Sequence, residues 1–291
     1  MKKVFLLLVL AVATFTLFGC KSSEYKVDGE FLAYEVSIHR NAPMVTMVSV
    51  TIEDGEVVAF NIDARQGSAT QTEGADTPDD TSDDKWSYAW NAKTKKELGD
   101  DYGMVANGGA VAEWYEQAAL IEAYMLENGV DSVEVDADTV ITNITGVTIK
   151  DGGYTTLAAE ALELAKAGKF QAVYCTSDDL VIATMMVDEK GVASDLVLDV
   201  LQGRPDGATF AWRDQTKQEL GLEYGMKDAS AIGKEWFEQA DAIAAYVFEN
   251  GADSIEVNED GDISNITGAS VGDSGYSEVF ALLFDFANYE V

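Results

Sequence analysis

The chain contains one long stretch of sequence twice. Residues 89–154 align with residues 211–276 at a constant spacing of 122 and without a gap, and 34 of the 66 aligned positions are identical. The regions before them match more loosely, residues 28–67 with residues 167–203. A repeat of this length is a whole folding unit rather than one turn of a solenoid. We therefore expect two tandem domains, at residues 28–166 and 167–291.

Each copy begins with a predicted β-hairpin. β-branched residues at 45–52 and 57–62 flank Asp54-Gly55, a dipeptide typical of tight hairpins. In the second copy, residues 181–187 and 192–197 flank a turn that contains Gly191. Sequential strands joined in this way predict an antiparallel sheet.

Helices follow the strands in each copy. Residues 112–128 are predicted to form a helix that ends at Gly129, and its counterpart ends at Gly251. Apolar residues at helical spacing are expected to pack it on the core: Trp114, Ala118, Ile121 and Met125, with Trp236, Ala240, Ile243 and Val247 in the second copy. Last helices are expected at 154–166 and from Tyr276 towards Asn288. Strands and helices do not alternate regularly, so each copy is expected to be α+β rather than a parallel doubly wound sheet.

The first twenty residues have the pattern of an export signal. Two lysines precede an apolar run at residues 4–18, which is shorter than the roughly 20 residues of a membrane-spanning helix. Leu17-Phe18-Gly19-Cys20 resembles the lipobox of bacterial lipoproteins, in which the cysteine takes a diacylglycerol and becomes the mature N-terminus. This resemblance implies a signal peptide at 1–19, a tether at 20–27 and lipid anchorage through Cys20 to the outer face of the cytoplasmic membrane. The alternative is an ordinary signal peptide that ends beside a cysteine.

The composition excludes several classes of function. With 52 acidic and 19 basic residues the formal charge is −33, which argues against nucleic-acid binding. One His and two Cys exclude His-rich metal sites and iron–sulfur clusters. Cys175 lies in a strand-like stretch and is expected to be an inert core thiol. No catalytic base, nucleophile dyad or metal cluster stands out, which favours a carrier over an enzyme with its own substrate.

The repeated loop at residues 143–148 and 265–270 is the sharpest chemical feature. Gly146 and Gly268 permit a tight turn and a close backbone approach. Exposed N–H groups shortly before a helix would suit a phosphate. Hydroxyl groups on the loop, one of which could carry a phosphate covalently, belong to Thr145, Thr148, Thr267 and Ser270. The alternative is an ordinary turn.

This loop, at the end of an α+β domain on a lipoprotein, resembles the [Ser/Thr]-Gly-Ala-[Thr/Ser] motif of the FMN-binding domain family. Both copies also share Lys-x-Glu-Leu-Gly-x-x-Tyr-Gly-Met, and the resemblance extends over residues 24–291. In this family a flavin transferase links FMN through its phosphate to the last residue of the motif, which implies up to two covalent FMN groups, on Thr148 and Ser270. Thr142 and Ser264 stand where the family usually has Asp, and Val147 replaces the usual Ala.

The resemblance also suggests which residues line the flavin. Tyr102 and Met104, with their counterparts Tyr224 and Met226, are the candidates, the alternative being a turn packed on the core. The family includes two-domain lipoproteins of extracellular electron transfer in Gram-positive bacteria. The expected function is therefore electron transfer from a membrane donor to an extracellular acceptor. The alternatives are a surface binding lipoprotein without covalent flavin and a purely structural surface protein.

Overall fold

The structure is a computed structural model and describes residues 24–72, 85–177, 179–206 and 209–291. The predicted signal peptide and the lipidation site Cys20 lie outside the described residues. Within the part that is described, no helix is both long and apolar enough to cross a bilayer.

The first half of the chain forms a four-stranded antiparallel sheet in the order β1-β2-β3-β4. The strands are β1 (Gly29–His39), β2 (Ala42–Glu53), β3 (Glu56–Thr72) and β4 (Lys85–Trp90). The predicted Asp54-Gly55 hairpin is confirmed, because both residues have positive φ, 52° and 73°. Their N–H groups donate to the Asp28 carboxylate at 3.0 and 3.1 Å, which ties the residue before β1 to this turn.

The second half forms a three-stranded antiparallel sheet and a separate two-stranded ribbon. The sheet contains β5 (Lys169–Thr176), β6 (Asp179–Val187) and β7 (Ala193–Leu201), and the ribbon contains β8 (Gly203–Asp206) and β9 (Thr209–Trp212). The turn at Gly191 is confirmed by its φ of 76° and by the bond from Asp188 N–H to the Val192 carbonyl at 3.0 Å.

The helices follow the strands in the same order in both halves, except that α2 has no counterpart in the second half. The first half contains α1 (Lys95–Leu98), η1 (Gly99–Tyr102), α2 (Met104–Gly108), α3 (Trp114–Asn128), η2 (Val130–Ser132) and α4 (Tyr154–Ala167). The second contains α5 (Lys217–Leu220), η3 (Gly221–Tyr224), α6 (Trp236–Asn250), η4 (Ala252–Ser254) and α7 (Tyr276–Phe286). The predicted apolar stripes of α3 and α6 are buried, including Trp114 and Trp236. Gly129 and Gly251 end these helices as predicted.

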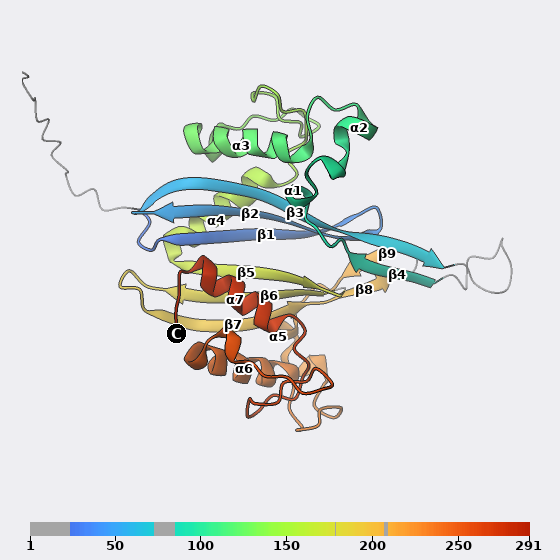
Figure 1. Cartoon of the computed structure of the whole chain (residues 1–291), viewed down its shortest axis with the longest axis vertical. Helices are drawn as coiled ribbons and strands as arrows, with labels where there is room; N and C mark the ends of the chain where they lie inside the picture. Colours follow the sequence, from blue (N-terminus) through green and yellow to red (C-terminus); the bar gives the residue numbers. More distant parts are fainter. Residues whose placement is uncertain (1–23, 73–84, 178, 207–208) are drawn as a thin grey trace, which may run out of the picture.

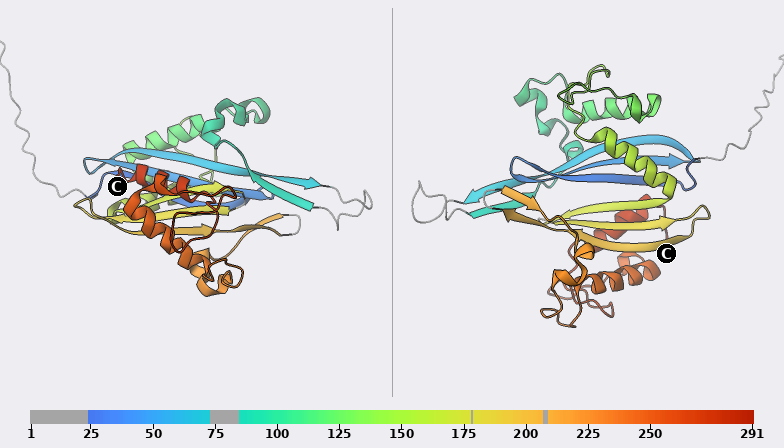
Figure 2. Two further views of the ribbon diagram at one scale, coloured as in Figure 1. Left: turned by 60° about the horizontal axis from the view of Figure 1, so that its bottom comes forward. Right: turned by 180° about the vertical axis from the view of Figure 1, so that it is seen from behind.

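The two sheets lie edge to edge, with β1 beside β5, while α3 and α6 lie on opposite sides of the molecule (Figure 1). Helix α4 packs on β1 and β2, and α7 packs on β5 and β6, as the view from behind helps to show (Figure 2). One continuous hydrophobic core includes residues of both halves. The fold is thus mixed α+β with antiparallel sheets, as the sequence predicted.

Matching residues of the repeat meet where the halves touch. Phe31 and Phe170 stack with ring centroids 4.2 Å apart, and Trp90 and Trp212 approach to 6.0 Å. The Gln171 side chain adds a bond to the Leu32 carbonyl at 3.2 Å. The interface between the halves, called the seam below, is therefore mostly apolar. Matching residues of the two copies contact each other across it.

Candidate functional site

The repeated loop of the first half is held by one buried side chain. Gln117, on α3, is 0% exposed. Its Oε1 atom accepts from the backbone N–H of Thr148 at 2.7 Å and from the Thr148 hydroxyl at 3.2 Å. Its Nε2 atom donates to the Ala112 carbonyl at 2.9 Å, so both ends of the amide have partners. The amide therefore fixes both the backbone and the hydroxyl of the candidate attachment residue.

The second loop has the same arrangement, with nearly the same hydrogen-bond distances. Gln239, also 0% exposed, accepts from the Ser270 N–H at 2.8 Å and from its hydroxyl at 3.2 Å. Its Nε2 atom donates to the Ser230 hydroxyl and to the Lys234 carbonyl, at 3.1 and 3.3 Å. Thr148 is exposed and Ser270 is half-buried. Both hydroxyl groups are thus oriented and lie at or near the surface.

Each loop is a tight turn built around a glycine. The Val147 N–H donates to the Ile144 carbonyl at 3.1 Å, and Gly146 has a φ of 88°. The matching Ala269 to Ile266 bond is 3.2 Å, with a φ of 98° at Gly268. A left-handed backbone of this kind is strained for any other residue. The predicted tight turn is therefore confirmed, with Thr145 and Thr267 exposed on it.

Two backbone N–H groups of the first loop form hydrogen bonds within the protein. Those of Val147 and Thr148 bond to Ile144 and Gln117. The following helix α4 begins with Asp151 accepting from the Thr155 N–H at 3.0 Å, and Asp273 accepts from the Tyr276 N–H at the start of α7. Carboxylates therefore accept from the N–H groups at the two helix starts, where the sequence suggested that a phosphate could bind.

The two departures from the family motif have structural roles. Thr142 and Ser264 donate from their hydroxyl groups to the carbonyls of Glu134 and Glu256, at 3.2 and 3.1 Å. The side chain of Val147 is only 7% exposed and belongs to the core. The larger residue at 147 is thus accommodated inside the fold, away from the Thr148 hydroxyl.

The segment from Tyr102 to Met104 is anchored by a buried glutamate. Glu113 accepts from the N–H groups of Met104 and Val105 at 2.8 and 2.9 Å. Glu235 does the same for Met226 and Lys227, at 2.8 and 3.2 Å. In the first half Tyr102 and Met104 line a cavity of about 410 Å³, together with His39, Arg40, Gln66, Gly103, Asn107 and Gly108.

A lysine, half-buried in the first half and buried in the second, lies beside each tyrosine. The Lys95 Nζ atom lies 5.4 Å from the ring centre of Tyr102 and 4.9 Å from that of Trp114. Lys217 lies 5.4 and 5.2 Å from the rings of Tyr224 and Trp236. Burial lowers the pKa of Lys95 to about 8, against an opposing effect of Asp63. Burial also lowers the pKa of Lys217.

Each tryptophan of this group is bonded to a tyrosine 40 residues later. Trp114 donates from Nε1 to the Tyr154 hydroxyl at 3.2 Å, and Trp236 donates to Tyr276 at the same distance. Trp114 and Gln117 are three residues apart on α3, so they lie on one face of the helix. The start of α3 therefore joins the loop that carries Thr148 to the cluster around Tyr102.

The sequence predictions singled out the tyrosines and methionines but missed the lysines and glutamines. Lys95, Lys217, Gln117 and Gln239 are among the identical positions of the repeat, and this was the available signal. Spacing alone could not show that residues 31 positions apart, Gln117 and Thr148, would bond.

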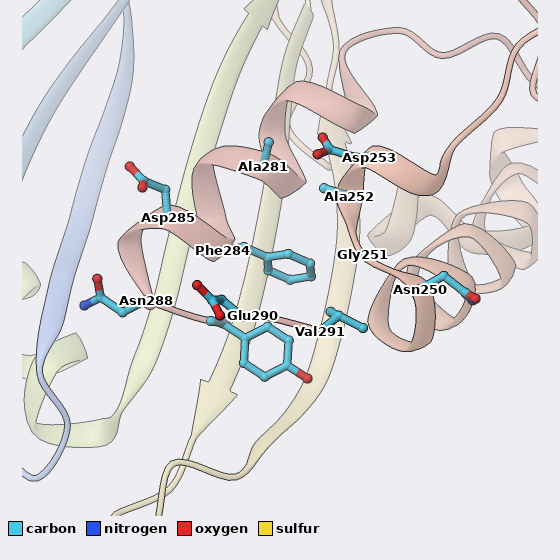
Figure 3. Close-up of a pocket in the computed structure, with 11 residues that line it drawn as sticks. Asn250, Gly251, Ala252, Asp253, Ala281, Phe284, Asp285, Asn288, Glu290 and Val291 are labelled. Atoms are coloured by element: carbon cyan, nitrogen blue, oxygen red, sulfur yellow. The ribbon is translucent and has the colours of Figure 1, made fainter.

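Two further features are not candidates for a phosphate site: a cavity beside the C-terminal residues and the thiol of Cys175. A cavity of about 530 Å³ beside the C-terminal residues has three acidic residues in its lining, Asp253, Asp285 and Glu290 (Figure 3). Cys175 lies on β5, and burial raises the pKa of its thiol to about 12. Cys175 is half-buried, so the inert core thiol stays a prediction. Among the described residues no group of His, Cys, Asp and Glu could hold a metal ion.

Comparison with known proteins adds little to these observations. No protein-family model matches the chain, and no curated protein matches it. A solution NMR structure of a protein from Clostridium thermocellum is 27% identical over 47% of this chain and 91% of its own, with a TM-score of 0.29. A TM-score this low supports no argument about fold or function. We therefore infer the function from the residues of the loops.

Proposed function

We propose that the chain is a lipid-anchored extracellular flavoprotein that carries covalently bound FMN on Thr148 and Ser270 and acts as an electron carrier. The observation that supports this best is the duplicated geometry of the attachment residues. Each hydroxyl lies 3.2 Å from a fully buried glutamine oxygen that also fixes the backbone of the same residue. An ordinary turn does not need its last hydroxyl oriented, and here this is done twice.

The residues present fit a phosphate ester. The hydroxyl oxygens of Thr148 and Ser270 are the atoms that would bond to the phosphorus, and Gln117 and Gln239 orient them. Attachment forms the oxygen–phosphorus bond, releases the hydroxyl proton and breaks the bond to the leaving group of a flavin phosphoanhydride, without any change in oxidation state. Bound FMN supplies reversible electron transfer, while the protein supplies orientation and electrostatics. A covalent bond also keeps the cofactor from being lost by dilution outside the cell.

The aromatic clusters at the start of α3 and α6 support the same proposal. The rings of Tyr102 and Tyr224 each lie beside a lysine ammonium group that also lies over a tryptophan. Aromatic faces and a nearby cation suit a flavin ring, which is planar and gains electron density on reduction. The proposal includes FMN-binding-type domains at 28–166 and 167–291, anchorage through Cys20, and three partners: a flavin transferase, a membrane electron donor and an extracellular acceptor.

Co-expression of the full chain with a flavin transferase tests the proposal. The intact mass should rise by one or two FMN increments, and the yellow colour should survive denaturation. Thr148→Ala and Ser270→Ala should each remove the increment of one site, whereas Thr139→Ala, which changes an exposed hydroxyl outside the loop, should remove none. A transferase-exposed protein without any increment would refute the proposal.

A surface binding lipoprotein without covalent flavin is the second candidate. The cavity of about 410 Å³ favours it, because Arg40 and His39 line that cavity and neither forms a salt bridge within the described residues. Under this alternative the intact mass stays unchanged after exposure to the transferase, and Arg40→Gln weakens the binding of a small anion measured by calorimetry.

A further inference from the structure

We infer that Lys234 is a phosphate-binding side chain of the second loop, and that Ser270 therefore accepts the phosphate-bearing ligand more readily than Thr148 does. This inference rests on the proposed function and adds an order of preference between its two sites. It concerns a residue outside the repeated motif, since Ala112 occupies the matching position of the first copy.

The ammonium group of Lys234 lies directly over the second loop. A β-carbon built on Gly268 would lie 3.0 Å from Lys234 Nζ and 3.4 Å from the β-carbon of Ala242. The Lys234 carbonyl accepts from Gln239 Nε2 at 3.3 Å, and the other end of that amide holds Ser270. Lys234 is therefore tied to the loop through its backbone and covers it with its charge.

This charge is not committed to another group. Lys234 forms no salt bridge in the described part of the chain. The two carboxylates that follow it are already engaged: Glu235 accepts from the N–H groups of Met226 and Lys227, and Glu238 accepts from the Glu235 N–H at 2.9 Å. An ammonium group over a loop of a chain with a formal charge of −33 is a local exception to the prevailing negative field.

The first loop has an apolar cover instead. A β-carbon on Gly146 would lie 3.1 Å from Leu120 Cδ1, and position 112 offers only a methyl group. The backbone N–H groups of Val147 and Thr148 are committed, as they are for the matching residues of the second loop. Among the described residues, a cation thus lies over the glycine of the second loop and not over that of the first.

A phosphate ester on Ser270 retains negative charge, and charge-assisted hydrogen bonds from an ammonium group stabilise such charge more than neutral bonds do. The same ammonium also attracts the anionic donor before the bond forms, an effect that added salt screens. We expect attachment at Ser270 to be faster than at Thr148 by roughly threefold or more, within the range of one partly exposed charge interaction.

The experiment follows both sites in the full chain during co-expression with limiting flavin transferase. Peptide mass spectrometry measures the FMN-bearing fraction of the peptides that contain Thr148 and Ser270. Lys234→Met should lower the fraction at Ser270 by roughly threefold or more and leave Thr148 unchanged. Ala112→Lys should raise the fraction at Thr148, and Lys227→Met, a change of a nearby exposed lysine, should alter neither. Circular dichroism shows whether each variant is folded.

Three outcomes separate this inference from the proposed function. If wild-type protein carries FMN at both sites and Lys234→Met leaves Ser270 loading unchanged, the inference is wrong and the proposed function stands. If both peptides lose FMN together in Lys234→Met, the lysine acts on the fold and the inference is also wrong. If neither peptide of the wild-type chain carries FMN, the proposed function fails and the inference fails with it.

Discussion

The Oε1 atom of Gln117 serves two groups of Thr148, the backbone N–H at 2.7 Å and the hydroxyl at 3.2 Å. Gln117→Leu keeps a similar volume but removes the acceptor, so a loop N–H loses its partner. We expect the free energy of unfolding to fall by about 1–3 kcal/mol, because the buried side chain loses its hydrogen bonds to Thr148 and to the Ala112 carbonyl. Urea unfolding followed by tryptophan fluorescence measures it. Gln215→Leu, at an exposed position, is the control and should change stability little.

Tyr276→Phe should leave the buried indole N–H of Trp236 without its acceptor. The ring packing between the two residues is retained, so the change isolates one hydrogen bond. We expect a loss of about 1–3 kcal/mol in the free energy of unfolding. The double variant Tyr276→Phe with Trp236→Phe should lose less than the sum of the two single losses. Strict additivity would contradict a direct bond between the two side chains.

Lys95 should make stability depend on pH in the alkaline range. Its pKa is about 8 in the folded protein and near 10.5 without burial. A base with a lowered pKa reduces stability while it is charged, and this cost is fully present below about pH 8. The cost disappears as the pH rises from about 8 to 10.5, because the unfolded chain then binds the proton and the folded chain does not.

Lys95→Met removes this titration. The variant should gain most over the wild-type chain at pH 7, and the difference should shrink by roughly 2–3 kcal/mol by pH 10.5, since each pKa unit corresponds to about 1.4 kcal/mol. Urea unfolding of both proteins at each pH measures the difference. Lys150→Met, at an exposed lysine, provides the control. A difference that stays constant with pH would show that the Lys95 ammonium is not desolvated.

Cys175 should resist alkylation in the folded protein. Burial raises the pKa of its thiol to about 12, and only the thiolate reacts with iodoacetamide. At pH 8 the peptide that contains Cys175 should remain unmodified over hours in buffer and react within minutes in denaturing urea. Peptide mass mapping distinguishes it from Cys20. Equal rates in both conditions would contradict the burial of this thiol.

The repeat, the hairpins and the long helices could be predicted from the sequence because their signals are local. Asp54-Gly55 and the stripe from Trp114 to Met125 report their own conformation, and the structure confirms both. Of the first strands, only the strand-like stretch around Cys175 in β5 was predicted, since β1 and β5 show no regular alternation of buried and exposed residues. The predicted last helix was also slightly long, because α7 ends at Phe286 rather than near Asn288.

The candidate site could be predicted only in part, for a related reason. The loop glycines and hydroxyl groups stand together in the sequence, so Thr148 and Ser270 were evident. Their partners are distant along the chain: Gln117 precedes Thr148 by 31 positions. Lys234 lies 34 positions before Gly268 and has no counterpart in the first copy. Such contacts depend on how helix and loop pack, which no local pattern encodes.

The pairing of Phe31 with Phe170 and of Trp90 with Trp212 also bears on how this chain can evolve. In an isologous dimer the same patch of both subunits forms the interface, and residues on the two-fold axis meet their own copies; this seam resembles that arrangement within a single polypeptide. In a dimer of identical subunits, every mutation changes both sides of the interface. Here each side is encoded separately, so the halves can diverge at their loops, as Ala112 and Lys234 have done, while each ring of the seam constrains its counterpart.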